Sequence, residues 1–383
     1  MTERGWRWCG SVAIIAPVSM TGGAGRAGIW RGLAANHAKE GELRMSDTAR
    51  VGLIGCGGIA GRHVQWLLDR KDCRITALCD KNKDAVADKL AAVKKLRPDD
   101  EPATMDDHTE LLARDDVDGV CVLLPHSLHH PIAKAAMEAG KHVLVEKPMV
   151  TDLAQAEDLI ATSEKTGMKL AIAYQRSFLP EYLYVHEMVK KGEFGQVRFM
   201  TAHVEQGWYN IVTNPDNKKK RGWKSDPAQA GGGQLVDTGS HTVAAMLYVC
   251  QMDPVEVFAF IDNCGLDVDV NTAMAVRFVQ GAQATVTVGG FGHSVTESIR
   301  VVGDKASARI FFRTVKEQAL EVNGEVIDAP SIIPKSDPDS NFVDVLLGKA
   351  EPGADGKLGL RVAQLSEAAY RSAETQTVAK VKS

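Results

Sequence analysis

The stretch that decides the fold is Arg50-Val-Gly-Leu-Ile-Gly-Cys-Gly-Gly-Ile-Ala60. Its apolar first half, residues 50–54, predicts a buried strand, and the glycines that follow predict a tight turn. Apolar side chains at helical spacing over residues 62–68 then predict a helix. A strand, a glycine turn and a helix in this order are typical of a parallel sheet whose faces are covered by helices.

The alternation of strand and helix continues to residue 174. Strand patterns lie at 74–79, 119–124, 142–145 and 169–174, and helical patterns lie at 84–96, 107–113, 131–139 and 151–166. Such alternation predicts a doubly wound parallel sheet. We therefore expect an N-terminal Rossmann domain over residues 46–174.

The pattern changes after Gln175. A helical pattern at 180–190 precedes strand patterns at 197–204, 255–261, 272–278, 284–288, 297–302 and 308–312, with further helical patterns at 235–249 and 358–375. Runs of strands with few helices between them favour a mainly antiparallel sheet. The predicted fold class is thus α/β, with a C-terminal α+β domain over residues 175–383 that contains an open sheet.

Composition limits the kind of partner. The chain has 383 residues and a formal net charge of −4, so it can hold two domains with cores of their own. Without a strong positive charge, it gives no support to a nucleic-acid or membrane partner and favours a small molecule. The seven cysteines are odd in number and include no C-x-x-C pair, which favours a reducing cytoplasm.

Residues 1–45 differ from the rest of the chain. Their apolar run, residues 11–18, is too short and too interrupted by proline to span a membrane. We expect a disordered leader or a misassigned start, with the real start at Met45. A signal peptide is the alternative, because Arg4 and Arg7 precede the apolar run.

The glycine turn has the features of a phosphate-binding loop. Gly55 permits the tight turn, Gly57 lets the backbone approach a pyrophosphate, and Ala60 keeps the helix close to the strand. Gly58 and Ile59 complete the loop, and the helix N-terminus offers N–H donors to a phosphate. The turn therefore predicts a dinucleotide-binding site.

The choice between dinucleotides depends on Asp80, which follows the second predicted strand. Its carboxylate would accept hydrogen bonds from a ribose diol and would repel a 2′-phosphate, so NAD is the favoured cofactor. Lys81 and Lys83 lie beside it and leave NADP possible.

A second informative stretch is Lys141-His-Val-Leu-Val-Glu-Lys-Pro-Met149. The predicted strand at 142–145 ends in Glu146, Lys147 and a proline. In open parallel sheets, ligands bind outside the carboxyl ends of the strands. We therefore expect Lys147 to point its ammonium group towards a ligand.

Three motifs, taken with the glycine loop, resemble the glucose-fructose oxidoreductase / inositol dehydrogenase (Gfo/Idh/MocA) family. They are Leu124-Pro-His-Ser-Leu-His129, the stretch from Gly140 to Pro148, and Asp237-Thr-Gly-Ser-His241, and the resemblance extends from Arg50 to the C-terminus. It implies NAD(P)-dependent oxidation or reduction of a sugar or cyclitol. It also implies a substrate domain whose open sheet makes the contacts of a homodimer or homotetramer.

The resemblance further marks positions that contact the nicotinamide half of the cofactor in that family, namely Leu124, Pro125, His129 and Glu146. Lys147, which follows them, is also a candidate for cofactor binding. His126, His129 and His130 lie close together in sequence, but no cysteine or carboxylate completes a ligand set, so no metal site is expected. We expect His63 and His108 on the surface of the first domain.

The candidate catalytic residues are Lys147, Asp237 and His241. Hydride transfer from a secondary alcohol needs a proton acceptor and a cation that holds the developing alkoxide. Lys147 suits the cation, and His241 suits the acceptor because the ordinary pKa of histidine, ~6.5, lies near working pH. Asp237 lies four residues before His241, so on the first turn of one helix it can orient the substrate or the imidazole. Either the lysine or the histidine can carry the proton.

Arg176 and Trp223 are the candidate substrate-binding residues. Arg176 lies at the crossover between the predicted domains. An indole face suits the C–H face of a pyranose, although packing is the default role of Trp208 and Trp223. The basic run at 217–224 suits either an anionic substrate or a solvated loop.

The leading hypothesis is a cytoplasmic NAD(P)-dependent dehydrogenase that acts on the CH–OH groups of a sugar, cyclitol or related polyol. One alternative is a tightly held cofactor that oxidises and re-reduces a sugar, or that makes a keto-sugar before bond cleavage. A second alternative is a sensor that binds the dinucleotide without chemistry. The complete set of Lys147, Asp237 and His241 favours the enzyme, since a sensor need not keep it.

Overall fold

Six parallel strands form the first sheet, in the order β3-β2-β1-β4-β5-β6. The computed structural model describes residues 47–314 and 317–382. The strand order is that of a doubly wound sheet, so the predicted Rossmann sheet is confirmed. The short strand β3 was not predicted. The strands are β1 (Ala49–Ile54), β2 (Cys73–Cys79), β3 (Ala103–Met105), β4 (Gly119–Val122), β5 (His142–Val145) and β6 (Leu170–Ile172).

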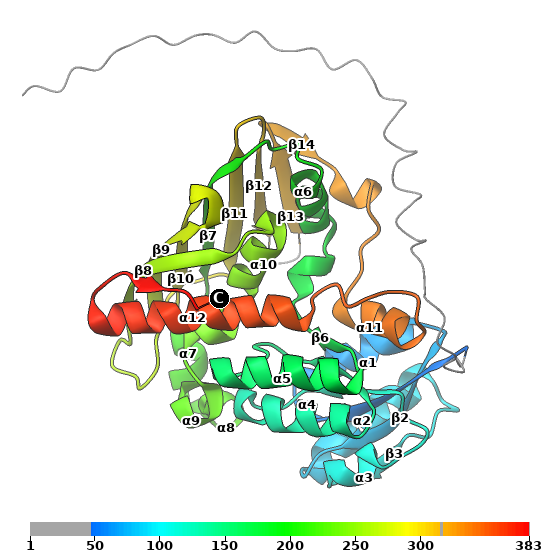
Figure 1. Ribbon diagram of the computed structural model, residues 1–383. Coiled ribbons are helices and arrows are strands. Elements are labelled where there is room, and N and C mark those ends of the chain that lie inside the picture. The colour runs from blue at the N-terminus through cyan, green and yellow to red at the C-terminus, as the bar shows by residue number, and fades with distance from the viewer. Residues whose placement is uncertain (1–46, 315–316, 383) are drawn as a thin grey trace, which may run out of the picture. The chain divides into compact units, whose positions relative to one another are not determined.

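Helices cover both faces of this sheet (Figure 1). α4 and α5 pack together on one face, whereas α1 packs beside α2 and α11 on the other. Phe342 and Val343 of α11 share an apolar cluster with Val51 and Leu53 of β1, so a late segment of the chain completes the cover. The sequence analysis did not predict that α11 packs back against the first sheet. The domain boundary at residue 174 stays a prediction. The helices are α1 (Ala60–Asp69), α2 (Lys83–Leu96), α3 (His108–Leu112), α4 (His129–Glu138), α5 (Leu153–Thr166) and α11 (Pro338–Leu346), with short 3-10 turns η2 (His126–Leu128) and η3 (Gln175–Phe178).

Nine strands form the second sheet, in the order β14-β13-β12-β11-β7-β10-β9-β8-β15. In the described part of this sheet β10 pairs with β7 in parallel and the other pairs are antiparallel, which confirms a mainly antiparallel sheet. Side chains of β9 and β10 alternate between buried and exposed, as expected where helices cover one face. The strands are β7 (Val197–Glu205), β8 (Pro254–Asp262), β9 (Asn271–Phe278), β10 (Gln283–Gly289), β11 (Thr296–Gly303), β12 (Ser307–Thr314), β13 (Glu317–Val322), β14 (Glu325–Ile327) and β15 (Ala379–Lys380); the helices that contact the sheet are α6 (Pro180–Lys190), α10 (Ser240–Cys250) and α12 (Gly356–Thr375).

The segment between β7 and α10 is mostly helical. The helix predicted at 235–249 begins with a π-helical turn, η5 (Leu235–Gly239), and continues as α10. A π turn holds more residues than an α turn, so the four-residue separation of Asp237 and His241 does not align them as it would on the regular helix that the sequence predicted. The preceding elements are α7 (Trp208–Thr213), α8 (Pro215–Arg221), η4 (Gly222–Ser225) and α9 (Pro227–Ala230).

The largest apolar cluster joins the two sheets. It contains Val143 and Val145 of β5, Met246 of α10 and Val286 of β10. Buried apolar contacts of this kind hold elements in a fixed arrangement. The carboxyl end of β5 is therefore held against the segment that carries Asp237.

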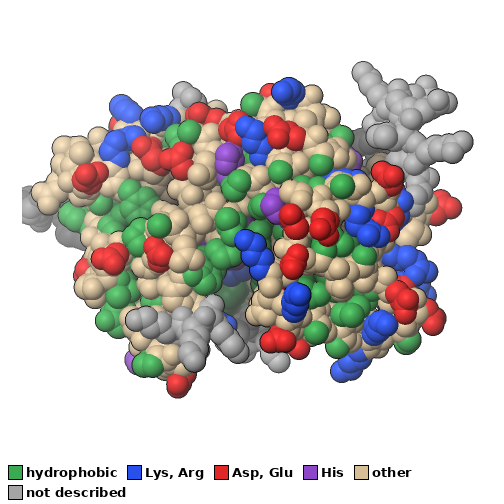
Figure 2. All heavy atoms as spheres, turned by 90° about the horizontal axis from the view of Figure 1, so that it is seen from below, with side chains coloured by type: hydrophobic (Ala, Val, Ile, Leu, Met, Phe, Trp, Pro, Cys, Tyr) green, Lys and Arg blue, Asp and Glu red, His purple; other side chains and the backbone are tan. Residues whose placement is uncertain are grey.

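The surface shows mixed charge. On the face drawn in Figure 2, acidic and basic side chains are interspersed among hydrophobic ones. Across residues 47–314 and 317–382, none of the helices is both long enough and apolar enough to cross a bilayer.

The three consecutive residues Gly231 to Gly233 must be glycines, because neighbouring side chains and backbone lie too close to leave room for a Cβ atom. Gly231 has a φ of +73°, a left-handed conformation that glycine adopts readily. A Cβ atom at Gly233 would overlap the backbone carbonyl of Asp269. The Asp269 carboxylate accepts hydrogen bonds from the backbone N–H groups of Gly233 and Leu235, both at 2.7 Å. These contacts fix the start of the π turn.

We expect Gly233→Ala to lower the free energy of unfolding by about 1–3 kcal/mol or more, because the added methyl group meets backbone that cannot move aside. Urea denaturation measures the change. Gly61→Ala, in α1, is the matched control: its Cβ would only reach a flexible lysine side chain, and alanine favours helix by up to about 1 kcal/mol. A Gly233 variant as stable as wild type would contradict this account.

Candidate active site

The turn after β5 brings Lys147 onto Asp237. The ammonium Nζ of Lys147 donates to the Asp237 Oδ1 atom at 2.8 Å and to the Asp237 backbone carbonyl at 3.1 Å. Strand β5 is buried between helices and ends where the chain turns, so the lysine projects from the carboxyl edge of the sheet. Two of the three predicted catalytic residues are therefore in direct contact.

Asp237 has a partner on each carboxylate oxygen. Its Oδ2 atom accepts hydrogen bonds from Lys224 Nζ at 2.6 Å and from the Trp208 indole N–H at 2.9 Å. Burial alone would raise the pKa of Asp237, but the ammonium groups of Lys147 and Lys224 hold it well below its usual range. A carboxylate that is ionised and fully engaged is a fixed negative charge, not a proton acceptor.

Lys224 was missed as a site residue by the sequence reasoning. It closes the basic run at 217–224, which gave no sign that one lysine turns inward. Burial lowers the pKa of Lys224 despite the nearby Asp237, because a low-dielectric setting disfavours the ammonium form. The signal that could have identified it is its place directly after Trp223, in the segment that precedes Asp237.

His241 lies close to this cluster without bonding to Asp237. Its ring meets the edge of the Tyr174 ring at a centroid distance of 6.1 Å. Its Nδ1 atom is buried and finds no hydrogen-bond partner within residues 47–314 and 317–382. Burial, together with the positive charges of Lys147 and Arg176, lowers the pKa of His241 well below its ordinary value. The imidazole is therefore neutral at working pH.

Trp223 lies against the motif from Leu124 to His129, which the sequence predicts to face the nicotinamide. Its ring packs edge-on against His126 at 4.8 Å, and His126 Nδ1 donates to the Ala230 carbonyl at 2.9 Å. Burial lowers the pKa of His126 to about 3. The segment that holds Trp223 and Lys224 thus packs over η2.

Arg176, the other predicted substrate ligand, is engaged elsewhere. Its Nε and NH2 atoms donate to the Glu297 carboxylate at 3.0 and 2.6 Å, and the Tyr182 hydroxyl donates to the same carboxylate at 2.7 Å. The side chain of Glu297 is fully buried. Arg176 therefore neutralises a buried charge, and its contact with substrate stays a prediction.

The glycine loop has the form that a dinucleotide requires. Gly55 has a φ of +101° and lies so close to Leu123 that no Cβ would fit. A Cβ at Gly57 or Gly58 would meet nothing within 4 Å among the described residues, which leaves open space for a phosphate. Ile59, at the start of α1, is partly exposed, whereas Ala60 is buried against the sheet. In the described structure α1 has no side-chain cap, so its first N–H groups can receive an anion.

Asp80 lies at the edge of this loop. Its Oδ2 atom accepts from the Cys56 backbone N–H at 2.7 Å, and Oδ1 accepts from the Asn82 N–H at 2.8 Å. The carboxylate thus holds the glycine loop to the end of β2. It stands where a ribose diol is expected.

The remaining predicted cofactor residues lie along the same edge. His129 joins two motifs, because its ring nitrogens approach the carbonyl oxygens of Leu124 at 2.8 Å and Pro148 at 2.7 Å, and Pro125 caps η2. Glu146 accepts from the Lys147 backbone N–H at 2.9 Å. Its other oxygen faces His63, which is fully buried; the expectation that His63 lies on the surface was wrong.

Comparison with known families gives matches over both halves of the chain. Residues 49–174 match a family model described as an oxidoreductase family with an NAD-binding Rossmann fold. Residues 182–309 match the model of the GFO/IDH/MocA C-terminal domain.

Individual proteins are also similar. D-xylose 1-dehydrogenase [NADP(+)] from Haloarcula marismortui is 25% identical, over 89% of this chain and 95% of that protein. D-glucoside 3-dehydrogenase from Escherichia coli is 26% identical, over 87% and 97%. The crystal structure of an aldose-aldose oxidoreductase from Caulobacter crescentus complexed with glycerol has a TM-score of 0.75 and 27% identity, over 87% of this chain and 99% of that one.

We expect Asp237→Ala to lower the free energy of unfolding by about 2–4 kcal/mol, because it leaves two partly buried ammonium groups without their counter-charge. Adding Lys224→Met to that variant should restore part of the loss, since one uncompensated charge is removed. Urea denaturation of the single and double variants measures both effects. Asp158→Ala, which breaks the more exposed pair with Lys134, is the control and should cost much less. A double variant less stable than Asp237→Ala alone would refute the shared-charge arrangement.

Proposed function

The chain belongs to the Gfo/Idh/MocA family of NAD(P)-dependent oxidoreductases, and from that premise we propose that it transfers a hydride between NAD and a secondary alcohol or ketone of a sugar, cyclitol or related polyol. One observation carries the proposal. Lys147 and Lys224 share the Asp237 carboxylate at the carboxyl end of β5, next to the motif that is expected to face the nicotinamide.

The residues of this chain divide the chemical work. Bound NAD would supply the acceptor for the hydride. The Lys147 ammonium holds the hydroxyl oxygen of the substrate and stabilises negative charge that develops on it. Asp237 keeps that ammonium in place, since both of its oxygens are already bound. Trp208, which donates to Asp237, keeps the carboxylate from turning.

His241 takes the hydroxyl proton. Because burial and nearby positive charges lower its pKa, the ring is neutral and has a nitrogen that can accept. The same low pKa makes it a weak base, so the proton must leave again once the hydride has moved. Protonation of His241 would therefore reduce the rate only well below the ordinary histidine pKa.

The comparisons favour a carbohydrate as substrate. The relatives over most of the chain are named for D-xylose, for a D-glucoside and for aldoses. Trp223, which packs on His126, offers an aromatic surface of the kind that binds the C–H face of a pyranose. Arg176 is held by Glu297, and its contact with a sugar remains part of the proposal.

The proposal also includes a homo-oligomeric assembly and a location in the cytoplasm. The second sheet leaves one face uncovered, with Phe260 of β8 70% exposed, and an exposed aromatic on an open sheet suits a homodimer or homotetramer contact. Five buried cysteines without disulfides, Cys56, Cys73, Cys79, Cys121 and Cys250, suit the cytoplasm.

A second candidate is an internal redox cycle on tightly held NAD(P). The similarity to an aldose-aldose oxidoreductase supports it, since one sugar would be oxidised and another reduced on the same cofactor. Dinucleotide that co-purifies and survives dialysis would favour this cycle. Rapid exchange with added cofactor would favour the simple dehydrogenase.

Asp80→Ser should weaken NAD binding by about 10- to 100-fold, because hydrogen bonds from a ribose diol to a charged carboxylate are worth about 1.5–3 kcal/mol. Binding of NADP should weaken less or improve, since repulsion of the 2′-phosphate is removed. Fluorescence titration with NADH and NADPH measures both. The control is Asp84→Ser, in the first turn of α2. An unchanged ratio of the two affinities would exclude Asp80 as the discriminating residue.

Lys147→Ala should reduce turnover by about 100- to 1000-fold, because the developing alkoxide loses its cation, while NADH affinity stays within about threefold. The assay follows the absorbance of reduced nicotinamide with NAD or NADP and a panel of aldoses, inositols, sugar acids and keto-sugars. Lys169→Ala, an exposed lysine paired with Glu351, is the control. Wild-type turnover in the Lys147 variant would remove that residue from the mechanism.

A further inference from the structure

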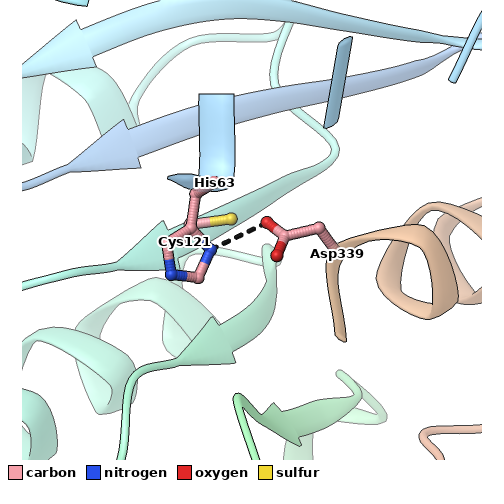
Figure 3. A group of neighbouring side chains, drawn as sticks. All are labelled: His63, Cys121 and Asp339. Carbon is pink, nitrogen blue, oxygen red and sulfur yellow. Dashed lines mark hydrogen bonds and ion pairs between the residues drawn. The ribbon is translucent and has the colours of Figure 1, made fainter. Parts of the chain in front are cut away.

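Three ionisable side chains from distant parts of the chain meet beneath the Lys147 turn. His63 comes from α1, Glu146 from the end of β5, and Asp339 from the first turn of α11. His63 Nδ1 lies 2.8 Å from Asp339 Oδ1, and His63 Nε2 lies 3.2 Å from Glu146 Oε1. Figure 3 shows the imidazole of His63 facing the Asp339 carboxylate, with Cys121 of β4 beside it.

Two carboxylates favour the charged form of the imidazole in this cluster. A neutral imidazole has one N–H and can donate to one carboxylate, whereas here each ring nitrogen faces a carboxylate oxygen. Burial would lower the pKa of His63, but Asp339 and Glu146 together raise it to about 10. The side chains of His63 and Asp339 are fully buried, so the ion pairs are shielded from water and salt.

A proton explains this cluster better than a metal ion does. The ligand atoms of His63, Cys121 and Asp339 lie within 4.8 Å of one another. Ligand atoms around one tetrahedral zinc ion stand about 3.3 Å apart or more, since the Zn–N and Zn–O bonds are about 2.0 Å long. The 2.8 Å between His63 Nδ1 and Asp339 Oδ1 is shorter than that and has the length of a hydrogen bond.

The cluster is connected to the catalytic lysine by one carboxylate. Glu146 uses Oε1 towards His63 and Oε2 to accept from the Lys147 backbone N–H at 2.9 Å. The helix that carries His63 begins at the glycine loop, and Asp339 holds the other side of the ring. The position of the Lys147 backbone is thus tied to the start of α1 through buried charge.

We propose that His63 is a positioning residue: its imidazolium, anchored by Asp339, holds Glu146 and, through Glu146, the peptide N–H of Lys147. This rests on the proposed function, in which Lys147 holds the reacting oxygen. A displacement of about 1 Å in a group that orients substrate can cost on the order of 100-fold in rate. His63 therefore matters for turnover although it does not touch the substrate.

The neighbouring side chains Asp337, Trp66 and Cys121 bring no positive charge that would oppose the imidazolium. Asp337, the cap of α11, adds negative charge near Asp339, and the Trp66 ring meets the His63 ring edge-on at 6.0 Å. Burial and the surrounding carboxylates raise the pKa of the Cys121 thiol well above its ordinary value, so Cys121 stays neutral. Near the ring, the negative charges therefore come from carboxylates, and all of them favour the imidazolium.

The first experiment tests the charge of the ring without any sugar. In full-length protein labelled with ¹⁵N-histidine, NMR should show a histidine signal with both nitrogens protonated from pH 6 to pH 9 that is absent from the His63→Gln variant. A neutral His63 ring at pH 7 would overturn the proposal. Because neither cofactor nor substrate is needed, this result stands apart from the fate of the proposed function.

The second experiment tests positioning. His63→Gln should lower kcat by about 10- to 100-fold, with a much smaller change in the KM of the sugar, and should weaken NADH binding in fluorescence titrations, where no sugar is present. His108→Gln, a more exposed histidine beside Asp107, is the control and should leave both unchanged. A folded His63→Gln variant with wild-type kcat and NADH affinity would overturn the proposal.

Asp339→Asn keeps the test decisive if His63→Gln does not fold. The amide preserves the shape and an acceptor oxygen but removes one charge, so His63 should lose its proton at a lower pH than in wild type. Its ¹⁵N titration should shift down by at least about one pH unit, and kcat should fall as pH rises through the new value. A His63 titration identical to wild type would show that Asp339 does not anchor the ring and would overturn the proposal.

Discussion

The constraint on which the site depends is the burial of one carboxylate, Asp237, between two ammonium groups. A buried charge is costly unless it is paired and hydrogen-bonded, so the chain must deliver Lys147, Lys224 and the Trp208 N–H to the same place. These groups come from the end of β5, from η4 and from α7. The packing of the two sheets, together with the helical segment between β7 and α10, brings these groups together.

A second set of buried charges lies beneath the first. Glu146 joins the two sets, because it lies next to Lys147 in sequence and faces His63 in space. Fixed charges of this kind cost little reorganisation when negative charge develops on a substrate. The same reasoning explains why Asp269 binds the N–H groups at the start of the π turn: it fixes the backbone that carries Asp237.

Sequence reasoning succeeded where the signal is local. The apolar runs and the glycine loop predicted the Rossmann sheet, and the stretch through Lys147 predicted that this lysine lies at the carboxyl edge of that sheet. It failed where the partner is distant: His63 was expected on the surface, and Arg176 gives no hint of Glu297, 121 residues away. It also missed Lys224, which belongs to a basic run that is typical of a solvated loop. Local periodicity also could not reveal the π turn or the short strands β3 and β14. Strand β6 is equally short but was predicted, because it lies within the longer apolar run at 169–174.

The most direct test of the central claim is the transfer of deuterium from NADH labelled at C4 of the nicotinamide. The protein is incubated with labelled NADH and a pool of keto-sugars and keto-cyclitols, and the products are analysed by mass spectrometry. The account predicts one deuterium on a newly formed secondary alcohol of a carbohydrate, and about 100- to 1000-fold slower label transfer in the Lys147→Ala variant under the same conditions. Tight NADH binding with no deuterium in any carbohydrate product would contradict it.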